Sequence, residues 1–302
     1  IHASFLQNPK SDARCGSFYR LYLKRMEQKT LPVPGKKPSN PGEGRKRTCK
    51  TPSGLIFCLE AHILFRGETM FGRICCLEKR GWRVRLVREE ILGLTLLRAE
   101  VPAPVRPRRL KKAARLLAGQ GIRRVVAPPG FGDWPLLRSQ GLEPVETAGL
   151  CQAMGARLAQ AALRERGLRA SESTVALRAQ RVTRALRLTA LELCPVVRRV
   201  VVTAPGGGDA LRAELRREFG VPAVEESRSL RPDVALHFGE AGGGGQTVFR
   251  LYGAEPDLAG FMLTPAGQEL PADCDRLPIL AALWETGRLS CERLDVISCS
   301  GT

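Results

Sequence analysis

From residue 70 onward, short apolar segments alternate with longer segments in which apolar residues recur at helical spacing. The short segments predict strands and the longer ones predict helices. The predicted strands are 123–127, 142–146, 174–178, 199–203, 222–225, 234–238, 247–252 and 261–264, and the predicted helices are 107–118, 134–140, 150–166, 182–194, 209–219 and 277–285. This alternation indicates an α/β fold, with a parallel sheet that helices flank on both faces.

The segment before the first predicted helix has a different pattern. Residues 82–87 alternate between apolar and polar, and residues 91–97 form an apolar run. Two such segments in close succession predict an N-terminal β-hairpin or two adjacent strands.

One short pattern follows two of the predicted strands. Residues 123–133 and 198–209 both run from an Arg-Arg pair through a valine-rich strand to Pro-Gly-x-Gly-Asp. In each copy a helix follows, and then a strand whose last residue is acidic, Glu146 in the first copy and Glu225 in the second. We therefore expect two related α-β-α-β halves, and chance similarity in an Arg- and Leu-rich chain is the alternative.

The Pro-Gly-x-Gly-Asp turn has two physical explanations. Glycine allows the positive φ of a tight turn, and Asp can cap the first N–H groups of the next helix. The same geometry can instead present N–H groups and the positive helix end to a phosphate. In the first copy Phe131 and Trp134 crowd the turn, so the phosphate explanation applies mainly to Gly206, Gly207, Gly208 and Asp209.

Residues 199–225 resemble the dinucleotide-binding βαβ unit, with a strand, a glycine-rich turn, a helix and a second strand that ends at Glu225. The chain is in this respect similar to bacterial proteins with a Rossmann-like fold. The resemblance implies NAD or another nucleotide as the cofactor, with the carboxylate of Glu225 holding a ribose. Leu211 stands where the motif has its third glycine.

Two further residues end predicted strands and can face the same crevice. Arg178 ends the strand 174–178, and His237 lies at the end of the strand 234–238. Open α/β sheets bind ligands at the carboxyl ends of their strands, although a surface Arg and a strand-end His are the simpler explanations. The four consecutive glycines at 242–245 predict a flexible hairpin loop. The candidate ligand-binding residues are Arg178, Gly206, Gly207, Gly208, Asp209, Glu225 and His237, and no catalytic motif or metal site is predicted.

The formal net charge of +18 comes mostly from Arg, with 48 Lys and Arg against 30 Asp and Glu. Arg, Ala, Gly and Pro all use GC-rich codons, so base composition can favour Arg over Lys. A general basic excess predicts nonspecific attraction to nucleic acid, but scattered Arg residues on a solvated surface are the simpler explanation.

Residues 1–69 differ in composition from the rest of the chain, because they are basic and rich in Pro and Gly. Their apolar residues also do not recur at the spacing of a helix or a strand. They predict a disordered basic leader, either an ordinary tail or translated upstream sequence ahead of a start at Met70. We expect an N-terminal α/β half with the hairpin at 70–148 and a C-terminal Rossmann-like half at 149–302.

Ten Cys occur without any C-x-x-C pair, which disfavours a zinc ribbon or a thioredoxin motif. Cys151 and Cys194 lie in apolar helical segments and are expected to be buried. The longest apolar stretch, at 54–65, is too short for a membrane span, and no signal peptide is evident, so a cytoplasmic location is expected.

Three hypotheses follow. The first is a Rossmann-like protein that binds a nucleotide or another small anionic ligand at the turn 206–209. The second is a noncatalytic regulatory or protein-interaction module with a degenerate Rossmann-like fold. The third is nonspecific nucleic-acid binding through an Arg-rich surface.

Overall fold

The computed structural model describes residues 71–302, apart from 221–222, 226–229, 268, 272 and 300–302. These residues belong to one compact unit, Arg66–Thr302. The predicted leader at 1–69 lies outside the described residues.

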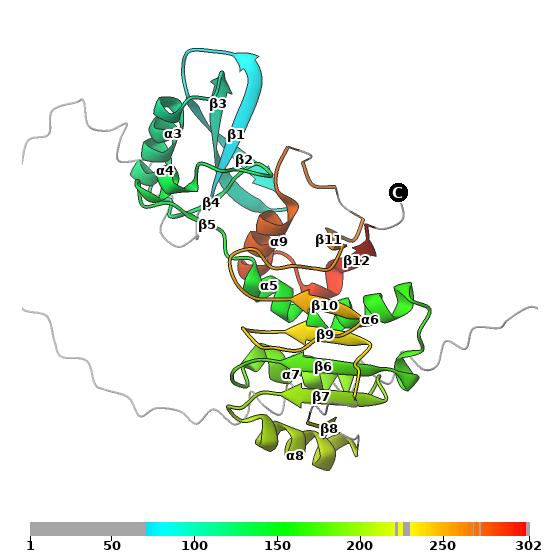
Figure 1. The fold of residues 1–302 in the computed structure, drawn as a ribbon. Coiled ribbons are helices and arrows are strands. Elements are labelled where there is room, and N and C mark those ends of the chain that lie inside the picture. The colour runs from blue at the N-terminus through cyan, green and yellow to red at the C-terminus, as the bar shows by residue number, and fades with distance from the viewer. Residues whose placement is uncertain (1–70, 221–222, 226–229, 268, 272, 300–302) are drawn as a thin grey trace, which may run out of the picture. The chain divides into compact units, whose positions relative to one another are not determined.

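The first sheet has five strands in the order β2-β3-β1-β4-β5 (Figure 1). The strands are β1 (Phe71–Arg80), β2 (Arg85–Ile91), β3 (Leu94–Ala103), β4 (Arg124–Val126) and β5 (Glu143–Pro144). β1 runs parallel to both β3 and β4, and β4 is parallel to β5. β2 is antiparallel to β3, and the chain turns between them at Leu92 and Gly93, both with positive φ.

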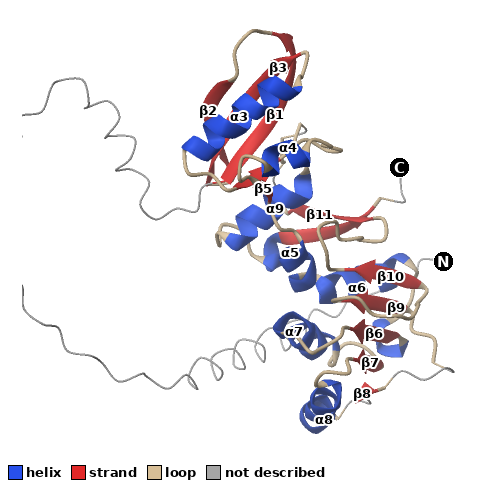
Figure 2. Ribbon diagram, turned by 60° about the vertical axis from the view of Figure 1, so that its left-hand side comes forward, coloured by secondary structure: helices blue, strands red, loops and turns tan. Residues whose placement is uncertain are grey.

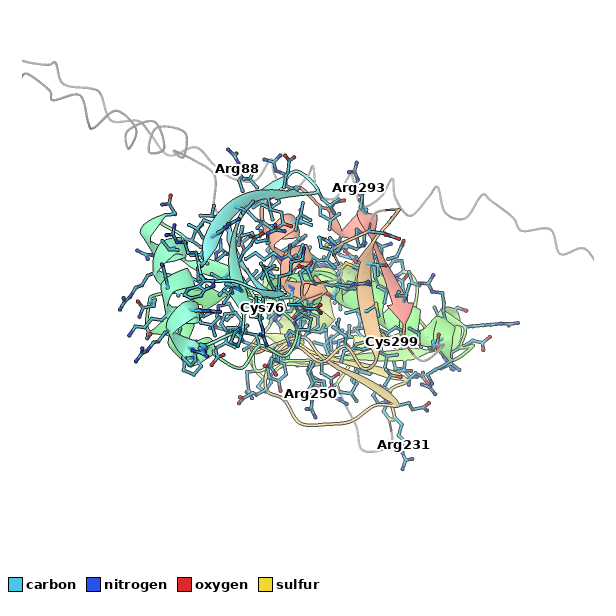
Figure 3. The ribbon with its side chains drawn as sticks, turned by 90° about the horizontal axis from the view of Figure 1, so that it is seen from above. Cys76, Arg88, Arg231, Arg250, Arg293 and Cys299 are labelled. Carbon is cyan, nitrogen blue, oxygen red and sulfur yellow. The ribbon has the colours of Figure 1, made fainter. Side chains whose placement is uncertain are left out.

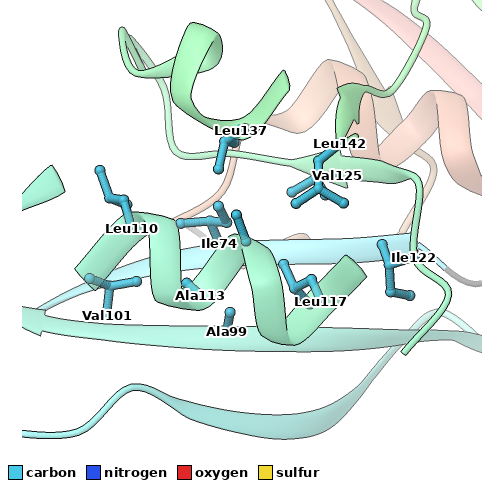
Figure 4. Close-up of a cluster of buried hydrophobic side chains, with 11 residues drawn as sticks. Ile74, Ala99, Val101, Leu110, Ala113, Leu117, Ile122, Val125, Leu137 and Leu142 are labelled. Carbon is cyan, nitrogen blue, oxygen red and sulfur yellow. The ribbon is translucent and has the colours of Figure 1, made fainter. Parts of the chain in front are cut away.

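Helix α3 (Pro107–Gly119) covers one face of this sheet because its apolar residues recur every three or four positions. Leu110, Ala113 and Leu117 face the strands, where they pack against Ile74 and Ala99 (Figure 4). The short helix α4 (Trp134–Arg138) adds Leu137 to the same core. Gly72 leaves room for this packing, since a Cβ there would lie 3.0 Å from Ile122 Cγ2.

The second sheet has five parallel strands in the order β10-β9-β6-β7-β8. The strands are β6 (Thr174–Arg178), β7 (Arg199–Thr203), β8 (Ala223–Val224), β9 (Val234–His237) and β10 (Thr247–Arg250). Helices α7 (Arg184–Leu193) and α8 (Gly208–Phe219) connect β6 to β7 and β7 to β8. Both helices lie on the same side of these strands (Figure 2).

The glycine-rich segment at 242–245 is not a hairpin loop, so that prediction is wrong. It joins β9 to β10, which are parallel, so the chain must return along the sheet between them. A hairpin would have required antiparallel neighbours.

The remaining helices and strands lie outside the two five-stranded sheets. Helices α5 (Ala148–Ala153) and α6 (Gly155–Glu165) precede β6, and α9 (Arg276–Glu285) lies between β11 (Phe261–Pro265) and β12 (Leu294–Ser298). β11 and β12 form a separate antiparallel pair. Short 3-10 turns at Ala170–Glu172 and Cys291–Arg293 complete the described elements.

The chain is therefore a mixed α/β protein with parallel sheets flanked by helices, as the alternation of segments predicts. Three details differ from the prediction. β1 and β12 were not expected, and the single helix predicted at 150–166 is divided at Met154 into α5 and α6. Gly155 begins α6, where a Cβ would lie 3.2 Å from Thr189 Oγ1, so the division accompanies close packing.

Candidate functional site

Arg178 and His237 meet at the carboxyl edge of the second sheet. They end the neighbouring strands β6 and β9 and are register partners. Both residues are buried, with 0% of Arg178 and 5% of His237 exposed to solvent. Of the seven candidate residues, these two are brought together most closely.

The contact between them fixes their hydrogen-bonding roles. Arg178 Nη1 lies 3.2 Å from His237 Nε2. A guanidinium only donates hydrogen bonds, so Nε2 accepts and the imidazole proton in this pair resides on Nδ1. Arg178 Nη2 also donates to the carbonyl oxygen of Gly244 at 2.8 Å.

The glycine segment 242–245 closes over this pair. Gly243 has a φ of 108°, and a Cβ there would lie 2.7 Å from Arg178 Cζ. Farther along, a Cβ on Gly245 would lie 3.1 Å from Ala235 Cβ, in the middle of β9. Glycine is thus required where this loop, which we call the glycine loop, crosses Arg178 and the sheet.

A small apolar cluster lies under the same loop. Ala176, Val201 and Ala235 are fully buried side by side on three neighbouring strands. Arg178 and His237 follow two residues after Ala176 and Ala235, so they lie on the same face of the sheet. The side chains that pack on the cluster come from strands and from the loop before β9: Val224, Leu230 and Val248.

The turn at Gly206, Gly207 and Gly208 packs against the turn after β6. The N–H of Gly206 donates to Gln180 O at 3.0 Å, and Gly206 O accepts from the N–H of Val182 at 2.8 Å. A Cβ on Gly206 would lie 2.9 Å from Arg181 Cβ. Gly207 has a φ of 90°, so it too requires glycine.

This packing uses N–H groups that a phosphate would need. The Gly208 N–H donates to Ala204 O at 2.9 Å, and the Gly206 N–H is bonded as described above. The glycines at 206 and 208 are thus explained by contacts within the chain. The expected caps also differ, because Asp133 is the N-cap residue of α4 but forms no side-chain capping bond, and Asp209 lies within the first turn of α8, whose N-cap residue is Gly207.

Asp209 and Glu225 are linked by a residue that the sequence did not single out. The buried Arg212 forms an ion pair with Asp209 one helical turn earlier, and its Nη2 lies 3.6 Å from Glu225 Oε2. Arg212 Nη1 donates to Val202 O at 2.6 Å. The side chains of Asp209 and Glu225 are largely exposed, at 97% and 73%. A basic residue three positions after Asp209 on a helix is the signal that could have identified this pair.

A second buried charged cluster lies on the first sheet and was also missed. Arg73, only 1% exposed, donates through Nη1 to both oxygens of Glu89, at 2.7 and 2.8 Å. Its Nη2 lies 2.5 Å from Asp273 Oδ1, and Cys75 Sγ donates to Asp273 Oδ2 at 3.4 Å. The cluster therefore ties β1 to the segment that precedes α9.

The pKa values in this cluster follow from burial and charge. Burial raises the pKa of the Cys75 thiol to about 11, and the Asp273 carboxylate adds to the effect. Burial also disfavours the charged form of Asp273, but the hydrogen bonds from Arg73 and Cys75 outweigh it and lower the pKa of that carboxyl. Cys151 and Cys194 are buried as predicted, and burial raises the pKa of each thiol to about 12.

A cavity of about 500 Å³ lies apart from the candidate residues. Its lining is mostly apolar and comes from the turn after β4, from the loop before β11, from β11 itself and from the segment around the start of α9: Pro129, Pro256, Asp257, Leu258, Phe261, Met262, Leu263, Cys274, Asp275, Arg276 and Leu277. In the described part of the chain, no group of three or more His, Cys, Asp or Glu side chains is arranged to hold a metal ion. None of the helices among those residues has the length and apolar character to cross a membrane.

Basic side chains extend from many different elements. Figure 3 labels Arg88 on β2, Arg231 before β9, Arg250 at the end of β10 and Arg293 before β12, all at the periphery. Such a spread is typical of a solvated Arg-rich surface.

Comparison with known proteins identifies no family. No protein-family model matches the chain, and no curated protein matches its sequence. Among solved structures, it is similar to L-tryptophan dehydrogenase from Nostoc punctiforme, with 18% identity and a TM-score of 0.26. The match covers 48% of this chain and 44% of that enzyme, so the chain spans less than half of the enzyme's length. At this TM-score the similarity supports no assignment of function.

Proposed function

We propose that the second sheet and its helices form a Rossmann-like unit. When β6 to β10 are numbered 1 to 5 along the chain, the strand order from the β8 edge is 3-2-1-4-5. Dinucleotide-binding sheets have the order 3-2-1-4-5-6, so this sheet has the same order without the sixth strand. The two α/β halves, 70–148 and 149–302, are proposed as related repeats. In support, β5-β4-β1 and β8-β7-β6 have matching strand orders.

The proposed function is the binding of a nucleotide or another small anionic ligand between the carboxyl ends of β6 and β9. The strand order reverses direction between these two strands, and ligands of open α/β sheets bind at such a point. The observation that carries the proposal is the register pair of Arg178 and His237 at this position. Arg178 is the anion anchor, because a guanidinium matches the oxygens of phosphate or carboxylate in geometry and charge.

The glycine loop acts as a lid in this proposal. With the loop closed, as in this structure, the Gly244 carbonyl oxygen accepts a hydrogen bond from Arg178 Nη2. An anionic oxygen of the ligand replaces that carbonyl when the loop opens, and His237 keeps the guanidinium in position through Nη1. In this proposal the Gly206–Gly208 turn borders the ligand but does not bind its phosphate through these N–H groups, because the N–H groups of Gly206 and Gly208 are already hydrogen-bonded within the chain. Asp209 and Glu225, held by Arg212, line the outer rim.

Thermal-shift measurements on the full chain test this function. The probes are inorganic phosphate, AMP, ATP, NAD⁺ and NADPH, each at increasing concentration. At least one of them is expected to raise the Tm of the wild-type protein, because a ligand that binds only the folded state stabilises it. Arg178→Lys, which keeps the charge but loses the planar fork, is expected to remove most of the shift.

Arg250→Lys is the matched control, because Arg250 ends β10 at the same edge of the sheet but is exposed. It is expected to keep the full ligand-induced shift. No change in Tm with any probe, or equal shifts in Arg178→Lys and the wild type, contradicts the proposal.

A noncatalytic interaction module is the second candidate. The observation that favours it is the bonding of the Gly206 and Gly208 N–H groups to Gln180 and Ala204, which fills the turn from within the chain. It predicts that none of the five probes changes the Tm, and that the glycine loop stays closed over Arg178.

A further inference from the structure

Trp82 is almost completely exposed in the loop between β1 and β2. Its side chain is 96% exposed, whereas the next most exposed large apolar residue of the described chain is Ile297, at 44%. A tryptophan side chain has a large apolar area, and in this exposed position it gains almost none of the stabilisation that burial would give. Single exposed apolar residues are common on protein surfaces, so exposure alone does not indicate a binding site. The residues around Trp82 therefore have to be considered with it.

The loop around Trp82 is strongly basic. Residues 79–85 read Lys-Arg-Gly-Trp-Arg-Val-Arg, and none of them is acidic. All four basic residues, Lys79, Arg80, Arg83 and Arg85, are exposed. The tryptophan is thus surrounded in the sequence by cations that point into water.

The start of α3 adjoins this loop. Arg80 at the end of β1 is the register partner of Ala103 at the end of β3, and a Cβ on Gly81 would lie 2.9 Å from Pro102 Cβ. Figure 1 shows the β1–β2 connection and the start of α3 at the same end of the sheet. The loop therefore passes over the carboxyl end of β3, directly beside the segment that leads into α3.

That segment adds charge of the same sign. Arg106 and Arg108 are exposed at the start of α3, and Val105 is 41% exposed. Residues 101–132 contain eight basic residues and no acidic residue. The first turn of α3 also has no acidic side chain to offset the positive end of the helix.

Arg109 holds the segment in place from within. Its Nη1 donates to the carbonyl oxygens of Pro102, Ala103 and Pro104, at 2.9 to 3.1 Å. The backbone that leads into α3 is thus held by hydrogen bonds from this side chain. We call the exposed side chains of the loop and of this segment the Trp82 patch, and they are Lys79, Arg80, Trp82, Arg83, Arg85, Val105, Arg106 and Arg108.

We propose that the Trp82 patch binds single-stranded nucleic acid. An exposed aromatic ring stacks on a base whatever its sequence, and the surrounding Arg and Lys side chains contact the backbone phosphates. Only Trp82 and Val105 are exposed apolar residues in the patch, which is too little apolar area for membrane insertion. In a duplex the bases are stacked on each other, so the ring of Trp82 would have no free base to cover.

The decisive variant is Trp82→Ala, because it leaves the net charge unchanged and alters a side chain that packs on almost nothing. Binding is measured by fluorescence anisotropy of labelled oligothymidylate of about 12 nucleotides with the full chain. Loss of one stacking contact is expected to weaken binding about tenfold, and Trp82→Phe is expected to restore affinity to within about threefold. Ile297→Ala on β12 is the matched control and is expected to bind as the wild type.

The charge contribution is tested separately by salt dependence. Arg83→Ala/Arg85→Ala is compared with Arg250→Ala/Arg293→Ala, which removes the same charge from other elements. The first pair is expected to reduce the slope of log K against log salt by about 1.4, since each phosphate contact on a single strand contributes about 0.7. The second pair is expected to leave the slope close to that of the wild type.

Three results would overturn the proposal. One is equal affinity of Trp82→Ala and the wild type for the oligonucleotide. Another is an equal change of slope in the two double variants, which would indicate attraction to the whole basic surface. The third is binding that depends on Trp82 but is seen with vesicles of anionic phospholipid, or with a DNA duplex, and not with the single strand.

Discussion

Arg178 and His237 end neighbouring parallel strands in register, and Arg178 Nη1 donates to His237 Nε2 across 3.2 Å inside the protein. A buried guanidinium is stable only when its N–H groups have acceptors. The imidazole supplies one of these acceptors and the Gly244 carbonyl supplies another. Arg178 is therefore a buried cation at the carboxyl edge of the second sheet, and its position depends on these acceptors.

His237→Phe is expected to lower the free energy of unfolding by about 1–3 kcal/mol, because it leaves a buried Arg178 donor without this acceptor. Urea unfolding of the full chain, followed by circular dichroism, measures the loss. His237→Gln, whose amide oxygen can accept, is expected to recover part of it. The hydrogen bond has no structural importance if His237→Phe and His237→Gln are equally stable.

Gly243→Ala is expected to lower the free energy of unfolding by about 1–3 kcal/mol. The reason is twofold, since its φ is 108° and a Cβ would lie 2.7 Å from Arg178 Cζ. Gly244→Ala is the control, because no atom lies within 4 Å of a Cβ there, and it is expected to stay within about 1 kcal/mol of the wild type. Similar stability of the two variants would show that the glycine loop does not pack on Arg178.

One glycine from each Pro-Gly-x-Gly-Asp turn, Gly206 and Gly132, is expected to differ from the other in its tolerance of a side chain. Gly206→Ala places a Cβ 2.9 Å from Arg181 Cβ and is expected to cost about 1–3 kcal/mol. Gly132→Ala in the first copy meets no atom within 4 Å and is expected to be nearly neutral. Thermal unfolding of both variants measures the contrast, and an equal loss in the two would contradict the close packing at Gly206.

Part of this organisation follows from local sequence. The strands β6, β7 and β9 were predicted because each is a short, fully apolar run between turn residues, as in Val200-Val201-Val202. Arg178 and His237 were candidates for the same reason, since they stand where such runs end. Their burial and direct contact depend on which strands become neighbours, and short apolar runs carry no information about that order.

Other features were missed because long-range contacts decide them. β1 contains Arg73 and a Cys-Cys pair, which look unsuited to a central strand until Glu89 and Asp273 are placed beside the guanidinium. The glycine run at 242–245 resembles a hairpin turn in isolation. Its actual course is determined by the parallel pairing of β9 and β10, which brings Gly243 onto Arg178.

Asp273→Asn is expected to destabilise the protein at neutral pH and to have less effect in acid. The folded-state pKa of the Asp273 carboxyl is lowered, with hydrogen bonds from Arg73 and Cys75 outweighing the effect of burial. Its contribution is therefore complete above the ordinary aspartate pKa and is lost as the pH falls through the lower folded-state pKa. Urea unfolding at several pH values measures this, with Asp295→Asn on the exposed face of β12 as the control. A difference between wild type and Asp273→Asn that stays constant down to the most acidic pH would contradict the ion pair.

Hydrogen–deuterium exchange of the glycine loop, with and without ATP or NAD⁺, tests most directly whether an anionic ligand binds at Arg178. We predict that one of these nucleotides changes the exchange of the peptide covering 239–246 in the wild-type protein and in Arg250→Lys, and leaves it unchanged in Arg178→Lys. Exchange of this peptide that is the same with and without either nucleotide in the wild type, or that changes equally in Arg178→Lys, would contradict the account.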